Sequence, residues 1–287
     1  MTHTGLNSCH NKGNQKITQN IVTPTMCILF LYYLPHGSYY RLIVANNRDE
    51  VFERPTEPAT FWKDHSDVLA GRDLKVNNGG TWFGITVGGR FSTVTNFVTP
   101  PSGLISKPKS KGHLVIIASK SYRDGHHLNG FSLLTADLSA ENKDTSLAYT
   151  CNYDTDGARV LDPGVYGLGN SLLDNPWHKV KQGMEKFSNI VKSPDSTLTD
   201  QLFNLLSDCT KWPDPNIPNI GCNEEYNNNV SAIFMKPSRD QKGRLCGTRS
   251  QTVLLVSGDG DVTYTERSLQ PSTAQWTTVS HTVTLKI

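Results

Sequence analysis

Short β-type runs separated by turn residues fill most of this chain, and they restrict it to folds built on antiparallel sheets. Residues 79–87 and 90–97 are rich in β-forming residues and flank Gly88-Gly89, which is a strong hairpin signal. Further strands are predicted at residues 68–73, 131–137, 147–153, 164–170, 230–235, 251–257, 262–267 and 276–285.

Helical periodicity is confined to two neighbouring stretches. Residues 177–191 and 199–209 carry apolar side chains every three or four positions, and they follow one another instead of alternating with strands. The sequence therefore predicts an α+β fold with a mainly antiparallel sheet. Residues 54–62 and 212–229, which are interrupted by proline and asparagine, are predicted to be loops; residues 112–122 are predicted to form a short helix.

Polar and reactive groups concentrate between Met26 and Pro55. An apolar run begins directly after Cys27, and a second apolar run, residues 41–45, leads into Asn46-Asn47-Arg48-Asp49-Glu50. If the two runs pair side by side, the thiol and the charged cluster lie at the same end of one sheet. This stretch therefore predicts a reactive or binding site.

Composition excludes several classes of protein. The 287 residues carry a formal net charge of +2 with no basic block, which argues against a nucleic-acid partner. No run of about 18 apolar residues predicts a transmembrane helix. The six cysteines include no CxxC pair, so neither a disulfide framework nor a structural metal site is expected, and a reducing compartment suits them. We expect no metal site and no catalytic cofactor.

Residues 1–25 differ from the rest of the chain. They are rich in Asn, Thr, Ser and Gly, contain two lysines and no acidic residue, and lack the apolar segment of a secretory signal. We expect a disordered extension or an alternative start there, followed by a single domain over residues 26–287. A start at Met26 with removal of that methionine would leave Cys27 as the first residue.

An N-terminal cysteine is a nucleophile that carries its own base. A free α-amine titrates near pH ~7.7–8.0, so the amine can take the thiol proton at neutral pH. Arg48 would lower the pKa of the thiol, and Asp49 would hold the amine. Asn96 and Asn170 are neutral donors suited to an oxyanion, and Arg249 suits a carboxylate.

Each of these residues also has an ordinary structural explanation. A lone cysteine in an apolar run is more often a small core residue than a nucleophile. Arg48 and Asp49 suit a solvated turn, and asparagines such as Asn96 and Asn170 form turns in many proteins.

Many separate motifs in one order resemble the NRDE family, and within it the transport and Golgi organisation protein 2 homologues. The resemblance covers residues 26 to about 287. It rests on Met26-Cys27-Ile28, Ala45-Asn46-Asn47-Arg48-Asp49-Glu50, Arg54-Pro55, Leu69-Ala70-Gly71-Arg72-Asp73, Gly79-Gly80-Thr81-Trp82-Phe83-Gly84, Val94-Thr95-Asn96, Asn129-Gly130-Phe131, Gly167-Leu168-Gly169-Asn170 with Pro176-Trp177, and Gly247-Thr248-Arg249.

This family in turn resembles the N-terminal nucleophile cysteine hydrolases, which implies a four-layer αββα sandwich. The resemblance implies Cys27 as the nucleophile, Arg48 and Asp49 as its polar supports, and Arg249 as a second arginine. It assigns the oxyanion contacts to Asn96 and Asn170.

The family resemblance implies a carrier more than an enzyme. Its eukaryotic members are linked to heme trafficking and to lipid and acyl-CoA homeostasis, in the cytoplasm and mitochondria. We therefore expect a heme chaperone, with a linear amide hydrolase or an acyl-CoA-binding protein as alternatives. Transient contact with organelle membranes fits this expectation, and the proteins that accept the heme stay unidentified.

Heme would be held as cargo by the same polar residues. Arginines pair with propionates, and an apolar wall accepts the flat ring. The expected ligand-binding residues are Cys27, Arg48, Asn96, Asn170, Arg249 and His126. The candidate iron ligands are Cys27, His113, His126, His127 and Met235. The chain has no CxxCH motif that would select among them.

Overall fold

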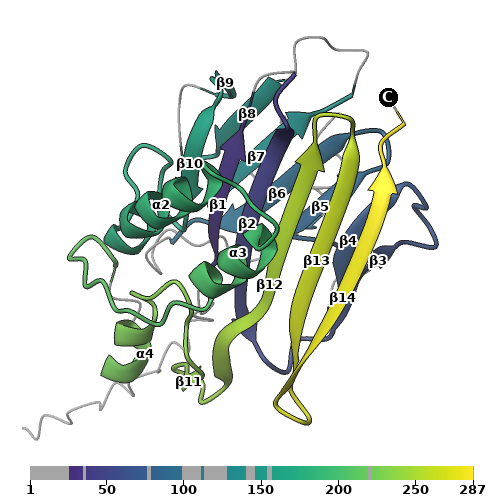
Figure 1. Ribbon diagram of the computed structural model, residues 1–287. Helices are drawn as coiled ribbons and strands as arrows, with labels where there is room; N and C mark the ends of the chain where they lie inside the picture. The colour runs from purple at the N-terminus through teal and green to yellow at the C-terminus, as the bar shows by residue number, and fades with distance from the viewer. Residues whose placement is uncertain are drawn as a thin grey trace, which may run out of the picture.

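Two antiparallel β-sheets packed face to face form the body of the protein (Figure 1). The computed structural model describes residues 26–34, 37–75, 79–98, 111–112, 128–139, 146–153, 157–218 and 222–286. The expected α+β class with mainly antiparallel sheets is confirmed.

The first sheet has seven strands in the order β10-β1-β2-β12-β13-β14, with β11 paired to β12. Its strands are β1 (Ile28–Tyr33), β2 (Tyr40–Val51), β10 (Gly164–Leu168), β11 (Ser238–Arg239), β12 (Leu245–Ser257), β13 (Asp261–Gln270) and β14 (Gln275–Thr284).

The second sheet runs in chain order from β3 to β9. Its strands are β3 (Thr56–Phe61), β4 (Val68–Asp73), β5 (Phe83–Thr86), β6 (Arg90–Asn96), β7 (Phe131–Asp137), β8 (Ser146–Cys151) and β9 (Arg159–Leu161). The predicted hairpin around Gly88-Gly89 is confirmed as β5–β6.

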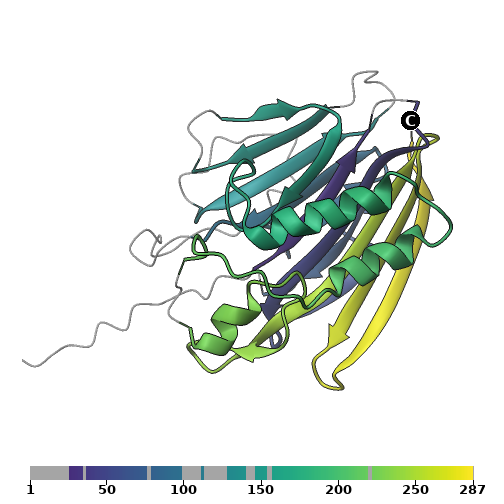
Figure 2. The same ribbon diagram turned by 60° about the vertical axis from the view of Figure 1, so that its left-hand side comes forward.

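Three described helices pack against strands of the first sheet: α2 (His178–Val191), α3 (Leu198–Leu206) and α4 (Glu224–Asn229). Figure 2 shows α2 and α3 lying across the outer face of this sheet. The second outer helix layer that the family resemblance implies has no counterpart within the described ranges. None of the described helices is long and apolar enough to cross a bilayer.

Alternation along β1 divides the core into two parts. Ile28 and Phe30 point towards the helices, whereas Leu29 and Leu31 point between the sheets. Helix α2 approaches β1 closely at Gly183, where an added Cβ atom would collide with Cζ of Phe30.

Hydrogen bonds also join the two sheets at their β3–β14 edge. Glu266 of β13 accepts a hydrogen bond from the backbone N–H of Ala59 through Oε1, at 3.0 Å. Nε2 of His281 lies 2.8 Å from the carbonyl oxygen of the same alanine.

Three local predictions are wrong. Residues 54–62 contain β3 instead of a loop, because Pro58 occupies an edge strand where its missing N–H is tolerated. The predicted loop 212–229 ends in α4, whose N-cap Asn223 accepts a hydrogen bond from the N–H of Tyr226. Residues 230–235, which are buried except for half-buried Phe234, form no strand. The predicted helix 112–122 lies outside the described residues from residue 113 onwards.

Candidate functional site

The thiol and the charged cluster lie at the same end of the first sheet, as expected. Strands β1 and β2 pair antiparallel, with Ile28 opposite Asn47. Continuing this register by one residue places Cys27 opposite Arg48. Since opposite residues of an antiparallel pair share a face, the thiol and the guanidinium lie on the same side of the sheet.

The Asn-Arg-Asp-Glu run belongs to the end of β2, so its side chains alternate between the two faces. Asn47 points towards the helices. Its Nδ2 donates hydrogen bonds to the carbonyl oxygens of Leu206 at 2.8 Å and Ile233 at 2.9 Å. This asparagine therefore attaches the end of α3 and the buried 230–235 segment to the sheet.

Arg48 points between the sheets. Its Cζ lies 4.0 Å from the centroid of the Trp82 ring, and its Nη1 donates to Oγ1 of Thr56 at 3.2 Å. Its Nη2 lies 3.5 Å from Oε2 of Glu50. The guanidinium is thus held in position by an aromatic face, a hydroxyl group and a carboxylate.

Asp49 is a buried carboxyl group beside the thiol. Oγ1 of Thr248 donates a hydrogen bond to its Oδ1 at 2.7 Å. Its Oδ2 has no hydrogen-bond partner within the described residues. Burial raises the pKa of this carboxyl to about 7, because water no longer stabilises the charged form.

The thiol of Cys27 is almost fully buried. Burial raises its pKa to about 12, and the negative charge of Asp49 adds to this effect. The backbone N–H of Asp49 and the charge of Arg48 act in the opposite direction but are smaller. With Met26 attached, burial therefore favours the protonated thiol of Cys27 over the thiolate.

The two candidate oxyanion asparagines lie next to each other. Nδ2 of Asn170 donates to the backbone oxygen of Asn96 at 2.7 Å. An added Cβ atom on Gly169 would lie 4.0 Å from the carbonyl oxygen of Cys27, so this turn adjoins the backbone of Cys27. The structure therefore places these asparagines at the Cys27 end of the sandwich.

Arg249 also lies at this end, at an irregularity in the pairing of β12 with β2. Its Nη1 donates hydrogen bonds to the carbonyl oxygens of Val51, at 3.4 Å, and of Arg54. Burial, with a smaller contribution from the neighbouring positive charge of Arg48, lowers the pKa of Arg249 to about 10. Its guanidinium holds the turn after β2.

Two lysines that the sequence interpretation missed complete the cluster. Lys111 donates through Nζ to Oδ1 of Asn96 at 2.8 Å and to the carbonyl oxygen of Gly130 at 2.6 Å. Lys179, near the start of α2, is fully buried and donates to the carbonyl oxygen of Ala232 at 3.3 Å. Burial lowers the pKa of both amines, that of Lys111 to about 8.

A half-exposed aromatic pair adjoins Lys111. The carbonyl oxygen of Gly130 accepts hydrogen bonds from both Nζ of Lys111 and the backbone N–H of Phe97. The rings of Phe97 and Tyr153 stack with centroids 4.6 Å apart, and Tyr153 is 46% exposed. The ammonium of Lys111 and the backbone of Phe97, whose ring stacks on Tyr153, are therefore joined through one carbonyl oxygen.

Of the remaining iron-ligand candidates, only Met235 lies within the described residues. Met235 is buried in the core beneath the helices. His113, His126 and His127 lie outside the described residues. Within the described ranges, no group of three or more His, Cys, Asp or Glu residues is arranged to hold a metal ion.

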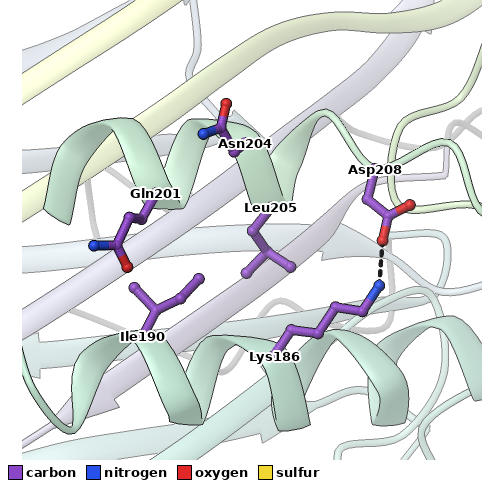
Figure 3. Close-up of a pocket in the computed structure, with 6 residues that line it drawn as sticks. All are labelled: Lys186, Ile190, Gln201, Asn204, Leu205 and Asp208. Carbon is purple, nitrogen blue, oxygen red and sulfur yellow. Dashed lines mark hydrogen bonds and ion pairs between the residues drawn. The ribbon is translucent and has the colours of Figure 1, made fainter. Parts of the chain in front are cut away.

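A shallow groove of about 500 Å³ lies between α2 and α3, and none of the predicted site residues lines it (Figure 3). Ile190 and Leu205 form its apolar part. Nζ of Lys186 and Oδ2 of Asp208 form an ion pair at 2.5 Å at one end of the groove.

Comparisons with solved structures give low overall similarity. A mutant of the conjugated bile acid hydrolase from Clostridium perfringens gives a TM-score of 0.44 at 9% identity, covering 91% of this chain and 97% of that chain. Penicillin V acylase from Agrobacterium tumefaciens gives a TM-score of 0.45 at 13% identity, covering 90% and 86%.

Sequence comparisons identify the family. The model of the family "Transport and Golgi organisation 2" matches residues 26–271. The Transport and Golgi organization protein 2 homolog of Bos taurus is 38% identical over 89% of this chain and 98% of its own length. The Mus musculus homolog is 34% identical over 91% and 100%. The chain therefore belongs to the Transport and Golgi organisation 2 family.

Proposed function

We propose that the Cys27 end of the sandwich binds an amphipathic ligand that carries carboxylates, with heme as the ligand, and that the protein is a heme carrier. The observation that carries this proposal is that Lys111 shares the Gly130 carbonyl oxygen with the backbone N–H of Phe97, whose ring stacks on Tyr153. An ammonium group pairs with a propionate, while stacked aromatic rings accept a flat macrocycle. The family resemblance, which implies heme trafficking in the cytoplasm and mitochondria, supports the choice of heme.

The state of the thiol supports a carrier over an enzyme. Cys27 follows Met26, which is fully buried, and the pKa of its thiol is about 12. Nucleophilic catalysis by cysteine needs the thiolate, which is scarce at neutral pH when the thiol pKa is this high. A carrier has no such requirement.

Titration of the full chain with ferric heme, followed by the Soret absorbance, tests the proposal. We expect saturable binding that weakens about tenfold in Lys111→Met, the loss of one charge-assisted contact. The affinity of the wild type should fall as the pH rises through about 8, since Lys111 loses its charge there, and Lys111→Met should lack this fall.

Lys181→Met is the matched control, because Lys181 is exposed on α2 and should leave binding unchanged. Absence of a spectral shift in the wild type would refute heme binding. Displacement of heme by a long-chain acyl-CoA would show that the site accepts acyl ligands as well, and an acyl-CoA that binds while heme does not would replace heme as the ligand.

A second candidate function is favoured by the orphaned Oδ2 of Asp49. If Cys27 were the first residue, its neutral α-amine would take the thiol proton, and the resulting ammonium would pair with this buried carboxylate. The family match begins at residue 26, immediately before Cys27. This arrangement supports a cysteine hydrolase of linear amides.

The hydrolase has its own test. A chain that begins at Cys27 should hydrolyse an N-acyl amide, and Cys27→Ala of the same chain should not. If the two chains release product at the same rate, the hydrolase is excluded, and the heme titration is unaffected by that result.

A further inference from the structure

We propose that the outer edge of β14 is a self-association surface, at which two copies of this chain pair their β14 strands antiparallel. This strand is the last in the first sheet, as Figure 1 shows in yellow. All ten residues from Gln275 to Thr284 pair with β13 on one side. No strand of the described residues pairs with the other side, so half of its backbone donors and acceptors face outwards.

The other three sheet edges carry features that prevent strand addition. β3 contains Pro58 and the exposed Glu57, with a register irregularity after Glu57. β9 is only three residues long and begins with Arg159. β10 has only five residues. Short length, proline, charge and a covering helix are the usual means by which proteins protect an edge.

β14 has none of these protections. Its sequence Gln-Trp-Thr-Thr-Val-Ser-His-Thr-Val-Thr contains no proline, lysine, arginine, aspartate or glutamate over ten residues, in a chain that is 19% charged. Each of its residues is exposed or half-buried. A long, uncharged, β-branched edge strand is a template for another strand.

The absence of charge favours a second copy as the occupant. When a strand pairs antiparallel with itself, a charge at its central position lies opposite the same charge, and β14 carries none there. A twofold axis perpendicular to the sheet also requires opposite residues to share a face. The registers with the greatest overlap therefore place either Val279 or Ser280 opposite its counterpart in the second copy.

Both registers cover apolar surface that the single chain leaves exposed. On the face that carries Thr278 and Ser280, Trp276 is 38% exposed. Self-pairing would place it beside Thr282 or Thr284 of the other copy, an aromatic and β-branched pair of the kind that stabilises sheets. On the opposite face, Val279 and Val283 are half-buried and would gain a neighbouring strand. The result is one continuous sheet across two copies.

Light scattering coupled to size-exclusion chromatography over a range of protein concentrations tests this proposal. The expected mass rises with concentration from 31.8 kDa towards twice that value. The double variant Thr278→Glu with Ser280→Glu should remain at 31.8 kDa, because either register sets glutamates opposite each other. Both positions are exposed, and Thr278 lies opposite Arg267 of β13, so the single chain should tolerate the acids.

The control carries two glutamates at exposed positions outside β14, Ser193→Glu with Thr210→Glu, and should associate like the wild type. Hydrogen exchange at residues 275–284 should slow as the wild type associates. A wild type of 31.8 kDa at all concentrations would overturn the proposal, as would association of the β14 double variant equal to that of the wild type.

Discussion

Asn47→Ala tests whether Asn47, the first residue of the Asn-Arg-Asp-Glu run, stabilises the fold by attaching the helix layer to the first sheet. The side chain is fully buried, and its Nδ2 donates hydrogen bonds to the carbonyl oxygens of Leu206 and Ile233. Alanine leaves two buried acceptors without this donor. At about 1–2 kcal/mol for each lost buried hydrogen bond, the free energy of unfolding should fall by about 2–4 kcal/mol. That is a large part of the stability of an ordinary domain, which is about 5–15 kcal/mol.

Urea denaturation followed by tryptophan fluorescence measures this loss as a lower midpoint with an unchanged slope. Asn46→Ala is the matched control. Nδ2 of Asn46 donates to the carbonyl oxygen of Ile28 at 3.1 Å, within the same sheet, and its other contact, to the carbonyl oxygen of Asn47, is long at 3.5 Å. Asn46→Ala should lower the free energy of unfolding by about half as much as Asn47→Ala.

Hydrogen exchange locates the effect. In Asn47→Ala, amides of α3 and of residues 230–235 should exchange faster than in the wild type, whereas in Asn46→Ala they should not. A loss in Asn47→Ala no greater than that in Asn46→Ala would refute the role of Asn47 as the attachment of the helix layer.

Three further predictions concern packing and charge. Gly183→Ala should lower the free energy of unfolding by at least about 1 kcal/mol in urea denaturation, since the clash with buried Phe30 outweighs the gain of about 1 kcal/mol in helix propensity; a more stable variant would contradict this. Because its pKa is raised, the carboxyl group of Asp49 binds a proton more tightly in the folded than in the unfolded chain. Its contribution to the free energy of unfolding is therefore complete below about pH 4 and is lost as the pH rises to about 7. Asp49→Asn should remove this component from the pH dependence of unfolding, and parallel curves for the two proteins would refute it. Cys27 should react with iodoacetamide about a thousandfold more slowly in the folded than in the unfolded chain near pH 8, as measured by peptide mass spectrometry, and equal rates would contradict its raised thiol pKa.

Local patterns were sufficient to predict most strands and the placement of the thiol. The pairing of β1 with β2 follows from two apolar runs close in sequence, and it brings Cys27 beside Arg48. The proline in residues 54–62 predicts a loop, but β3 forms there because an edge strand tolerates proline. The strand predicted at residues 230–235 failed because burial alone does not distinguish a strand from an irregular segment packed in the core.

The missed site residues depend on contacts between distant parts of the chain. Lys111 reaches Asn96 from a different segment, which no local pattern reveals. Lys179 left a signal, because it is a charged residue adjoining the apolar stripe formed by Val180, Phe187 and Val191. Thr248 lies within the Gly-Thr-Arg motif, in which the sequence suggests a role only for the arginine. The hydrogen bond from Thr248 to Asp49 joins residues 199 positions apart, so no local pattern predicts it.

A heme carrier keeps Cys27 within a continuous chain, whereas a hydrolase needs Cys27 as a free N-terminal nucleophile. The intact mass of the protein purified from the cells that express it distinguishes the two. For a carrier, we expect every form to retain Met26 or a longer N-terminal segment, which leaves the thiol buried and protonated. A mass that corresponds to a chain beginning at Cys27 would overturn this expectation and would make the hydrolase the leading function.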